Sequence, residues 1–297
     1  MVDIAQRAAR PEPPRRPERM IELETMGAVG DAARPLSVPE RLLQITGVRR
    51  MIVVAVLCIA WQLYAMYLNN SLLFPTLGET LEALYDSVVR GPLIERMMVS
   101  LQTLLIGYAA GLTIAGVFTT LAVSTRVGTD FLSTLTAMFN PLPAIALLPL
   151  ALLWFGLGAK SLVFVIIHSV LWAVALNTHS GFLSVSNTLR MVGRNCGLTG
   201  LSYVARILIP AAFPSILTGL KIGWAFAWRT LIAAELVFGV SSGSGGLGWF
   251  IYENKNQLEI PNVFAGLFTV IVIGLIVENV VFRVIEAKTV RKWGLQS

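Results

Sequence analysis

The stretch SLVFVIIHSVLWAVALNTHSGF, residues 161–182, decides the fold class. It contains no Asp, Glu, Lys or Arg. It has the length of about 20 mostly apolar residues that a helix needs to cross the hydrocarbon core of a bilayer. Backbone N–H and C=O groups find no water inside lipid, so an apolar run of this length must pair them within itself as a helix. The absence of polar and apolar alternation argues against a barrel strand.

Further apolar stretches lie on both sides of this one, and the chain as a whole has the composition of a membrane protein. Hydrophobic residues make up 55% and charged residues only 13% of the chain, with a mean hydropathy of +0.71. So few charges cannot cover the water-facing surface of a soluble domain. We predict an all-α integral membrane protein with about six transmembrane helices in residues 51–297. The predicted spans are residues 51–68, 97–123, 131–154, 161–182, 211–240 and 263–285.

Residues 1–50 differ from the rest, because they hold nine arginines, seven acidic residues and many prolines. Such a segment buries too little apolar surface to order itself, so we predict a largely disordered tail. An arginine-rich arm that binds nucleic acid is disfavoured, since acidic residues interleave and no binding fold adjoins. We therefore expect no nucleic-acid partner.

The distribution of Lys and Arg predicts the orientation in the membrane. With the N-terminus inside, the inner segments hold 17 of these residues and the outer loops hold four. Cytosolic loops carry the excess of positive charge, so both termini are predicted to be cytosolic. Residues 71–96 carry four acidic residues among apolar ones, which predicts an amphipathic helix at the outer surface.

The connection at residues 183–210 is basic, has no acidic residue and is still partly apolar. Most connections are shorter, about 4–6 residues, and more polar. We interpret it as an ordered helical elbow at the cytosolic face that docks a partner. An interfacial helix without a partner is the alternative.

The spacing within this elbow resembles the "EAA" loop of ABC importer permeases, in which Glu-Ala-Ala is followed by three residues, Gly, nine residues and Ile-x-Leu-Pro. Here Met191 stands in the place of the glutamate. The resemblance implies that the elbow docks into a groove on a cytosolic ATPase subunit. The residues assigned to this coupling are Met191, Val192, Gly193, Gly197, Ile207 and Pro210.

Two more stretches resemble the nitrate/sulfonate/taurine/bicarbonate permease group. They are Asn140–Leu150 with Leu153–Gly158, and Ala227–Glu235 followed by Gly245–Gly248. The resemblance implies a type I importer permease, multi-pass in a bacterial inner membrane, that works as a homodimer with ATPase subunits and a periplasmic binding protein. It also implies that ATP and Mg²⁺ bind the partner subunit, with no cofactor in this chain. The solute it implies is a small organic or inorganic anion.

The fifth predicted span contains three charged residues, Lys221, Arg229 and Glu235, and charge inside a bilayer is costly. These side chains should face protein or a water-filled path. Arg229 and Glu235 are six residues apart and lie on different helix faces, so they should not pair directly. Trp228 and Glu235 share a face. A structural pairing that includes Glu278 is the alternative to a pathway role.

Prolines in the third predicted span free backbone carbonyls and permit bends, which suits an element that moves between two states. A static kink is the alternative. The candidates for the pathway or its gate are Trp228, Arg229, Glu235, Pro141 and Pro143.

Catalytic and metal-binding patterns do not stand out, so we expect a transport subunit and not an enzyme. His168 and His179 are too isolated for a metal site. Residues 243–248 formally fit G-x-G-x-x-G, but a membrane span precedes them where a dinucleotide site needs a strand. Three alternatives stay open: an ion-coupled secondary transporter, which would show inverted repeats, a membrane enzyme or assembly factor, and the same permease role for an aromatic acid or vitamin precursor.

Overall fold

The computed structural model describes residues 44–123, 125–238 and 245–292. Most of the predicted tail, residues 1–43, lies outside the described part. Contacts divide the chain into two compact units, residues 1–56 and residues 57–297. In the first unit the described residues are 44–56, which include the beginning of helix α2.

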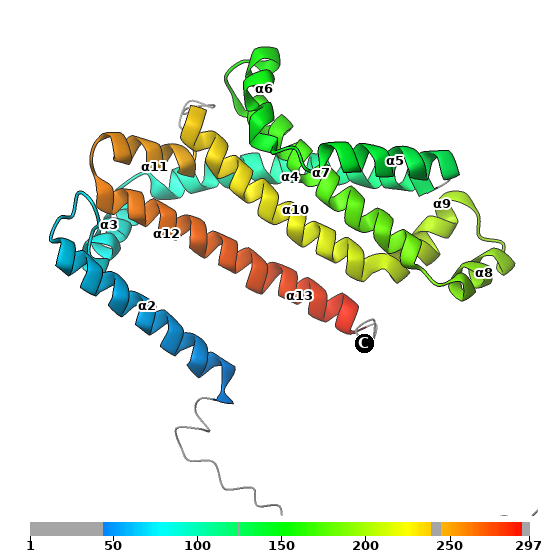
Figure 1. The fold of residues 1–297 in the computed structure, drawn as a ribbon, viewed down its shortest axis with the longest axis horizontal. Coiled ribbons are helices and arrows are strands. Elements are labelled where there is room, and N and C mark those ends of the chain that lie inside the picture. The colour runs from blue at the N-terminus through cyan, green and yellow to red at the C-terminus, as the bar shows by residue number, and fades with distance from the viewer. Residues whose placement is uncertain (1–43, 124, 239–244, 293–297) are drawn as a thin grey trace, which may run out of the picture. The chain divides into compact units, whose positions relative to one another are not determined.

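The described residues form helices joined by turns (Figure 1). The longest helices are α2 (Thr46–Leu68), α4 (Leu93–Val123), α7 (Ala159–Ser184), α10 (Ile209–Phe238) and α12 (Ile260–Ile276). The shorter ones are α3 (Leu77–Val89), α5 (Arg126–Phe139), η1 (Ala144–Leu147), α6 (Leu148–Phe155), α8 (Asn187–Asn195), α9 (Gly200–Tyr203), η2 (Val204–Leu208), α11 (Leu247–Asn256), η3 (Val277–Phe282), α13 (Arg283–Glu286) and η4 (Ala287–Arg291).

Among the described residues, five helical segments are long and apolar enough to cross a membrane, and a bent pair makes up to six. The five are Thr46–Leu68, Leu93–Val123, Ala159–Ser184, Gly200–Val237 and Ile260–Val290. This all-helical architecture confirms the predicted fold class.

The third predicted span is bent in the structure. Its two halves, α5 and the η1–α6 segment, meet at an angle of 87°. Asn140 caps the end of α5, and Pro143 is the residue before η1. Pro141 and Pro143 lack the N–H that a continuing helix needs, and a proline ring also clashes with the carbonyl four residues earlier in a helix. The chain therefore turns sharply between Phe139 and Ala144.

The fifth span starts earlier than its apolar run indicates. Its helix begins at Gly200, whereas the predicted start was residue 211. A π-helical turn, η2, ends at Leu208, two residues before Pro210. A proline in a regular helix clashes with the carbonyl four residues earlier, and the wider π turn relieves that constraint. Pro210 therefore lies inside the helical segment.

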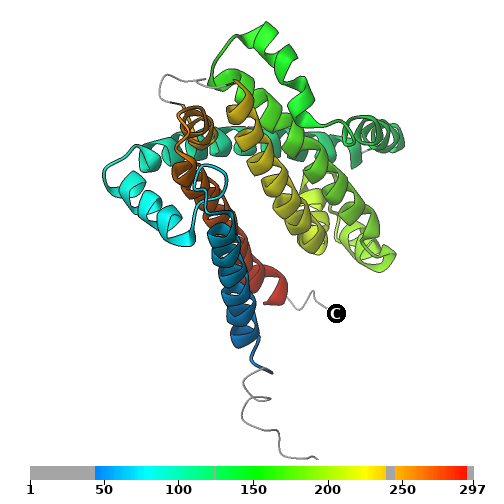
Figure 2. The ribbon, with the colours of Figure 1, turned by 60° about the vertical axis from the view of Figure 1, so that its left-hand side comes forward.

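Helix α7 is the centre of the described fold, since α4 and α10 both pack against it. Figures 1 and 2 show α10 running alongside α7. Gly111 of α4 faces Val170, and a Cβ atom at Gly111 would lie 2.8 Å from the Val170 side chain. Gly219 of α10 approaches Asn177 equally closely. In lipid, small residues of this kind let helices pack by van der Waals contact.

Helix α3 begins with a capping box outside the spanning segments. The Glu79 amide donates to Thr76 Oγ1 at 3.2 Å, and the Thr76 amide donates to Glu79 Oε2 at 2.8 Å. The Ser71 hydroxyl donates to the same carboxylate. The Thr76 backbone amide and the Ser71 hydroxyl lower the pKa of Glu79. The carboxylate therefore stabilises the cap above its ordinary pKa, and this stabilisation is lost as pH falls through the lowered value.

Replacing Thr76 with alanine should loosen the first turn of α3, because loss of an N-cap side chain costs about 1 kcal/mol. Hydrogen exchange of the peptide covering residues 77–89 should become faster at pH 7. Thr125→Ala is the matched control, since Thr125 caps α5 by accepting from the Gly128 amide at 2.9 Å. Unchanged exchange in α3, or an equal effect of both variants on α3, would contradict the capping role.

Candidate functional site

The elbow between α7 and α10 is built around α8, a short helix with defined ends. It lies at the end where α7 finishes and α10 begins (Figure 1). The Leu198 amide donates to the Gly193 carbonyl at 3.1 Å, and the Gly197 amide donates to the Arg194 carbonyl at 2.9 Å. These bonds form a Schellman motif, whose C′ position requires a left-handed residue. Gly197 occupies it with φ +73°, which explains a glycine at this place.

Arg190 ties α8 to the end of α7. Its Nε donates to the Val185 carbonyl at 3.0 Å, and its Nη2 donates to the Phe182 carbonyl at 2.5 Å. The last carbonyls of a helix have no partner within it, and a cation there also meets the negative end of the helix dipole. This role of Arg190 was not among the predictions, although an arginine soon after a helix end is a recognisable signal for it.

Gly193 lets α8 rest on the beginning of the next span. A Cβ atom at Gly193 would lie 2.9 Å from Ile207 and 3.0 Å from the Tyr203 ring, so the two segments touch through the glycine. Met191 and Val192 are exposed. Of the predicted coupling residues, Met191 and Val192 therefore point outward as an apolar pair, whereas Gly193 contacts the next span.

Ile207 and Pro210 border a cavity of about 480 Å³ between the two ends of the elbow. Ser184 and Leu189 also line it. The cavity therefore adjoins α7, α8 and the start of the fifth span.

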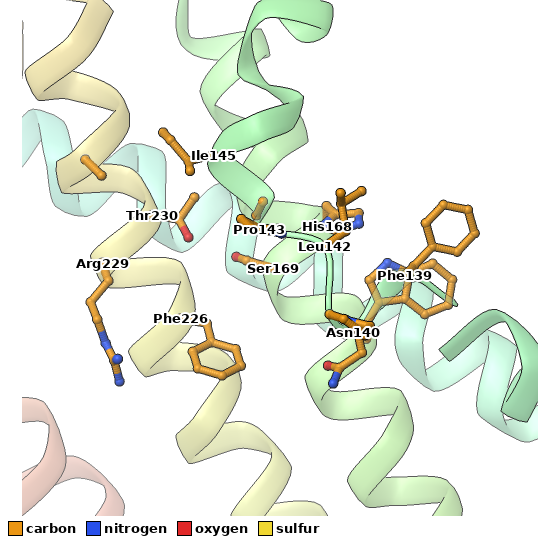
Figure 3. Close-up of a pocket in the computed structure, with 14 residues that line it drawn as sticks. Phe139, Asn140, Leu142, Pro143, Ile145, His168, Ser169, Phe226, Arg229 and Thr230 are labelled. Carbon is orange, nitrogen blue, oxygen red and sulfur yellow. The ribbon is translucent and has the colours of Figure 1, made fainter. Parts of the chain in front are cut away.

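A second cavity, of about 370 Å³, lies at the bend of the third span, between that bend and helices α7 and α10. Figure 3 shows Phe226, Arg229 and Thr230 on α10, and Phe139, Asn140 and His168 across from them. We name it the bend cavity. Its lining residues are Phe139, Asn140, Pro141, Leu142, Pro143, Ala144, Ile145, His168, Ser169, Trp172, Phe226, Arg229, Thr230 and Ala233.

Aromatic side chains form much of the wall of the bend cavity. Phe139 and Trp172 stack with ring centroids 5.2 Å apart and an interplanar angle of 13°. His168 meets the edges of both rings. On α10, the Arg229 guanidinium lies over the Phe226 ring, 5.7 Å from its centroid. The grouping of these four rings could not be predicted, because they come from three elements and share no local pattern.

Only some of the predicted pathway residues meet in this cavity. Pro141, Pro143 and Arg229 line it. Trp228 instead packs against α12, where its indole Nε1 donates to the Val270 carbonyl at 3.3 Å.

A further cavity of about 320 Å³ lies on another side of Arg229, and Trp228, Lys221 and Glu278 also border it. Lys221 forms an ion pair with Glu286 at 2.6 Å. The partner of Lys221 is therefore Glu286, not Glu278, the structural partner expected from the sequence.

Glu235 is buried away from Arg229, in a cluster that joins three helices. The Ser100 hydroxyl of α4 lies within 2.9 Å of both Glu235 carboxylate oxygens, and the Gly248 amide donates to Oε2 at 2.8 Å. The Leu247 amide donates to the Ser100 hydroxyl at 2.7 Å. The carboxylate thus accepts from one amide at the start of α11, where negative charge is favourable, and the Ser100 hydroxyl accepts from another. We name these residues the Glu235 cluster, and its contacts support the structural alternative for Glu235.

Comparison with known families places the chain among transport proteins. Residues 92–292 match the family described as binding-protein-dependent transport system inner membrane component. The chain belongs to this family. The prediction of an ABC importer permease is thereby confirmed. The chain is a multi-pass component of the inner membrane, and it is a transport subunit and not an enzyme. Membership also implies an ATPase and a solute-binding protein as partners.

Two relatives illustrate the substrates associated with similar permeases. The chain is 28% identical to the nitrate import permease protein NrtB of Synechocystis sp. over 242 residues, which cover 78% of this chain and 86% of that protein. It is 31% identical to the taurine transport system permease protein TauC of Escherichia coli over 141 residues, which cover 48% of this chain and 50% of that protein.

Alanine at Gly248 should destabilise the permease, because its Cβ atom would lie 2.6 Å from Glu235 Cβ and 2.7 Å from the Ile232 carbonyl oxygen. Overpacking of this kind costs about 1–3 kcal/mol. Gly116→Ala is the matched control, since Gly116 has open space around it and alanine favours a helix. In thermal unfolding of the detergent-solubilised permease, Gly248→Ala should lower the midpoint and Gly116→Ala should keep or raise it. Equal midpoints would refute the close contact at the Glu235 cluster.

Proposed function

We propose that this permease forms the translocation path for a small anion and that its ATPase partner drives it through the elbow. In this proposal ATP and Mg²⁺ bind the partner subunit, while the chain supplies the path and the moving helices. The observation that carries the proposal is the double attachment of α8. Arg190 holds it to the end of α7, and Gly193 sets it against the beginning of the fifth span.

The double attachment gives the elbow a mechanical role. A displacement of α8 moves the ends of two helices, α7 and α10, and both also line the bend cavity. Met191 and Val192 are the exposed apolar side chains that an ATPase groove would contact. With methionine in the place of the family's glutamate, this contact would rely on apolar burial and not on an ion pair.

The bend of the third span supplies a position where the path can open or close. The bend cavity and a smaller cavity of about 180 Å³ both border Asn140 and Pro141. His179 of α7 lines the smaller cavity, whereas His168 lines the bend cavity. A tilt of α5 against α7 would therefore change access between two spaces along one helix. Such rocking of packed helices is one of the usual forms of conformational switching.

The choice of an anion rests on Arg229. Its side chain is exposed within a predicted span, and it forms no ion pair with any residue that the structure describes. A cation inside a membrane is costly unless it meets water, protein or a ligand of opposite charge. Nitrate and taurine, named for the two relatives, both carry a negatively charged oxygen group. A small organic or inorganic anion is therefore the proposed solute.

The same exposed arginine supports a homodimer. Phe226 and Arg229 lie exposed on one face of α10, and a charged side chain cannot be left against lipid. A second copy that presents the same face would cover both and enclose the path, as in a two-fold symmetric interface.

Arg190→Ala should uncouple the complex while leaving it assembled. Hydrogen bonds from a charged donor contribute about 1.5–3 kcal/mol each, so stimulation of ATP hydrolysis by the binding protein should fall about tenfold or more. Basal ATP hydrolysis in proteoliposomes should persist. Arg194→Ala is the control, because Arg194 is exposed on the same helix. Equal stimulation in both variants, or equal loss in both, would contradict the proposed attachment.

The dimer is tested by expressing two copies of the permease with different affinity tags together with the ATPase. Purification through one tag should recover the other tag in the same complex. Recovery of a single tag only, at a stoichiometry of one permease per complex, would exclude the homodimer. The coupling role of α8 is tested separately by the Arg190→Ala variant.

A further inference from the structure

We propose that the bend cavity is a transit site for an aromatic acid, meaning a planar ring that carries a carboxylate or sulfonate group. This inference rests on the proposed function and assigns a substrate class to one site within it. The juxtaposition that supports it is one cavity lined both by a stacked pair of aromatic side chains and by Arg229, which forms no ion pair with any described residue and lies over the Phe226 ring.

The size of the cavity suits such a ligand. Its volume of about 370 Å³ lies in the range of small-molecule sites, roughly 300–1,000 Å³. The lining is mainly apolar, with a few polar groups at defined places, as is usual for sites that bind organic molecules. Asn140, Ser169 and Thr230 supply amide and hydroxyl groups, and the lining contains no acidic residue.

The ring of the ligand would lie among side-chain rings from both walls. Phe139 and Trp172 form a stacked pair on one wall, and Phe226 lies on α10 (Figure 3). Aromatic rings associate in stacked or edge-to-face arrangements and gain more than their buried area alone supplies. A nitrate ion or an aliphatic sulfonate would leave these faces unused.

The acid group of the ligand would meet Arg229. A planar guanidinium binds carboxylate-like groups through two parallel hydrogen bonds. Its position over Phe226 brings the cation and one of the aromatic faces together. Lys221, the other cation of α10, is already paired with Glu286, so Arg229 is the cation that this cavity presents. Glu278 borders the other cavity beside Arg229 and does not line the bend cavity.

The aromatic wall also holds unused hydrogen-bonding groups. Both ring nitrogens of His168 and the indole Nε1 of Trp172 are buried without a partner among the described residues. Buried polar groups are normally paired, so each such group calls for an explanation. A rotation of either ring toward an acid oxygen would give it a partner when the site is occupied.

The test is equilibrium binding of radiolabelled benzenesulfonate to the permease–ATPase complex in nanodiscs, without the binding protein. Methanesulfonate is the matched ligand, since it has the same acid group and no ring. We expect saturable binding of benzenesulfonate, about tenfold tighter than that of methanesulfonate, because ring contacts add to the charge contact. Both nucleotide-free and vanadate-trapped complexes are measured, so that either access state is sampled.

Three variants and a control locate the site. Arg229→Gln should weaken both sulfonates about tenfold, and Arg229→Lys should weaken them less, because a lysine keeps the charge without the planar fork. Phe139→Leu should weaken benzenesulfonate alone. Lys160→Gln removes an exposed cation at the start of α7, outside the cavity lining, and should change neither affinity.

Stimulation of ATP hydrolysis by the binding protein is measured on the same preparations. It separates failure of the transit site from failure of the proposed permease function. A complex that is stimulated normally but binds no benzenesulfonate in either state overturns the transit site and leaves the permease function intact. Equal affinity for the two sulfonates overturns the aromatic class. A wild-type complex that the binding protein never stimulates overturns the coupling function itself.

Discussion

Close packing of α4 and α10 against α7 is the constraint on which the rest of the described structure depends. Lipid is as apolar as a leucine side chain, so helices in a membrane gain little from apolar burial and rely on tight contact. Gly111 and Gly219 permit that contact at Val170 and Asn177. Because α4 and α10 hold α7 on both sides, α7 fixes the position of the segments attached to it. The elbow is attached at one end, and the bend of the third span is set against its middle.

The three charges of the fifth span have three different environments, and the differences follow from the cost of charge in a membrane. Lys221 is paired with Glu286, and Glu235 accepts hydrogen bonds from Ser100 and the start of α11. Both are therefore satisfied within the fold. Arg229 is left facing cavities, which makes it the charge with capacity to act on a ligand. A single span thus carries two charges that stabilise the fold and one that is available to a ligand, and its sequence alone does not distinguish them.

Local chemistry carried much of the prediction. The spans are visible in the sequence because an apolar run of sufficient length has no other stable form in lipid. Gly197, which the sequence assigned to the elbow, ends α8 in the structure, since glycine is the residue that a left-handed cap favours. The prolines at 141 and 143 indicated a break in the third span, but not its angle of 87°. Helix α11 was not predicted, because its sequence follows a glycine-rich stretch and has no strong apolar period.

Sequence alone established a helical membrane protein with a basic elbow and costly charges in its fifth span. Apolar length, charge bias and the positions of glycine and proline determine these features, because each acts on the backbone of neighbouring residues. Tertiary structure decided which distant residues meet. The burial of Glu235 beneath α11 and the meeting of Phe139, Trp172, Phe226 and Arg229 in one cavity join residues from separate elements. Such contacts depend on how helices cross and turn, and no local pattern records them.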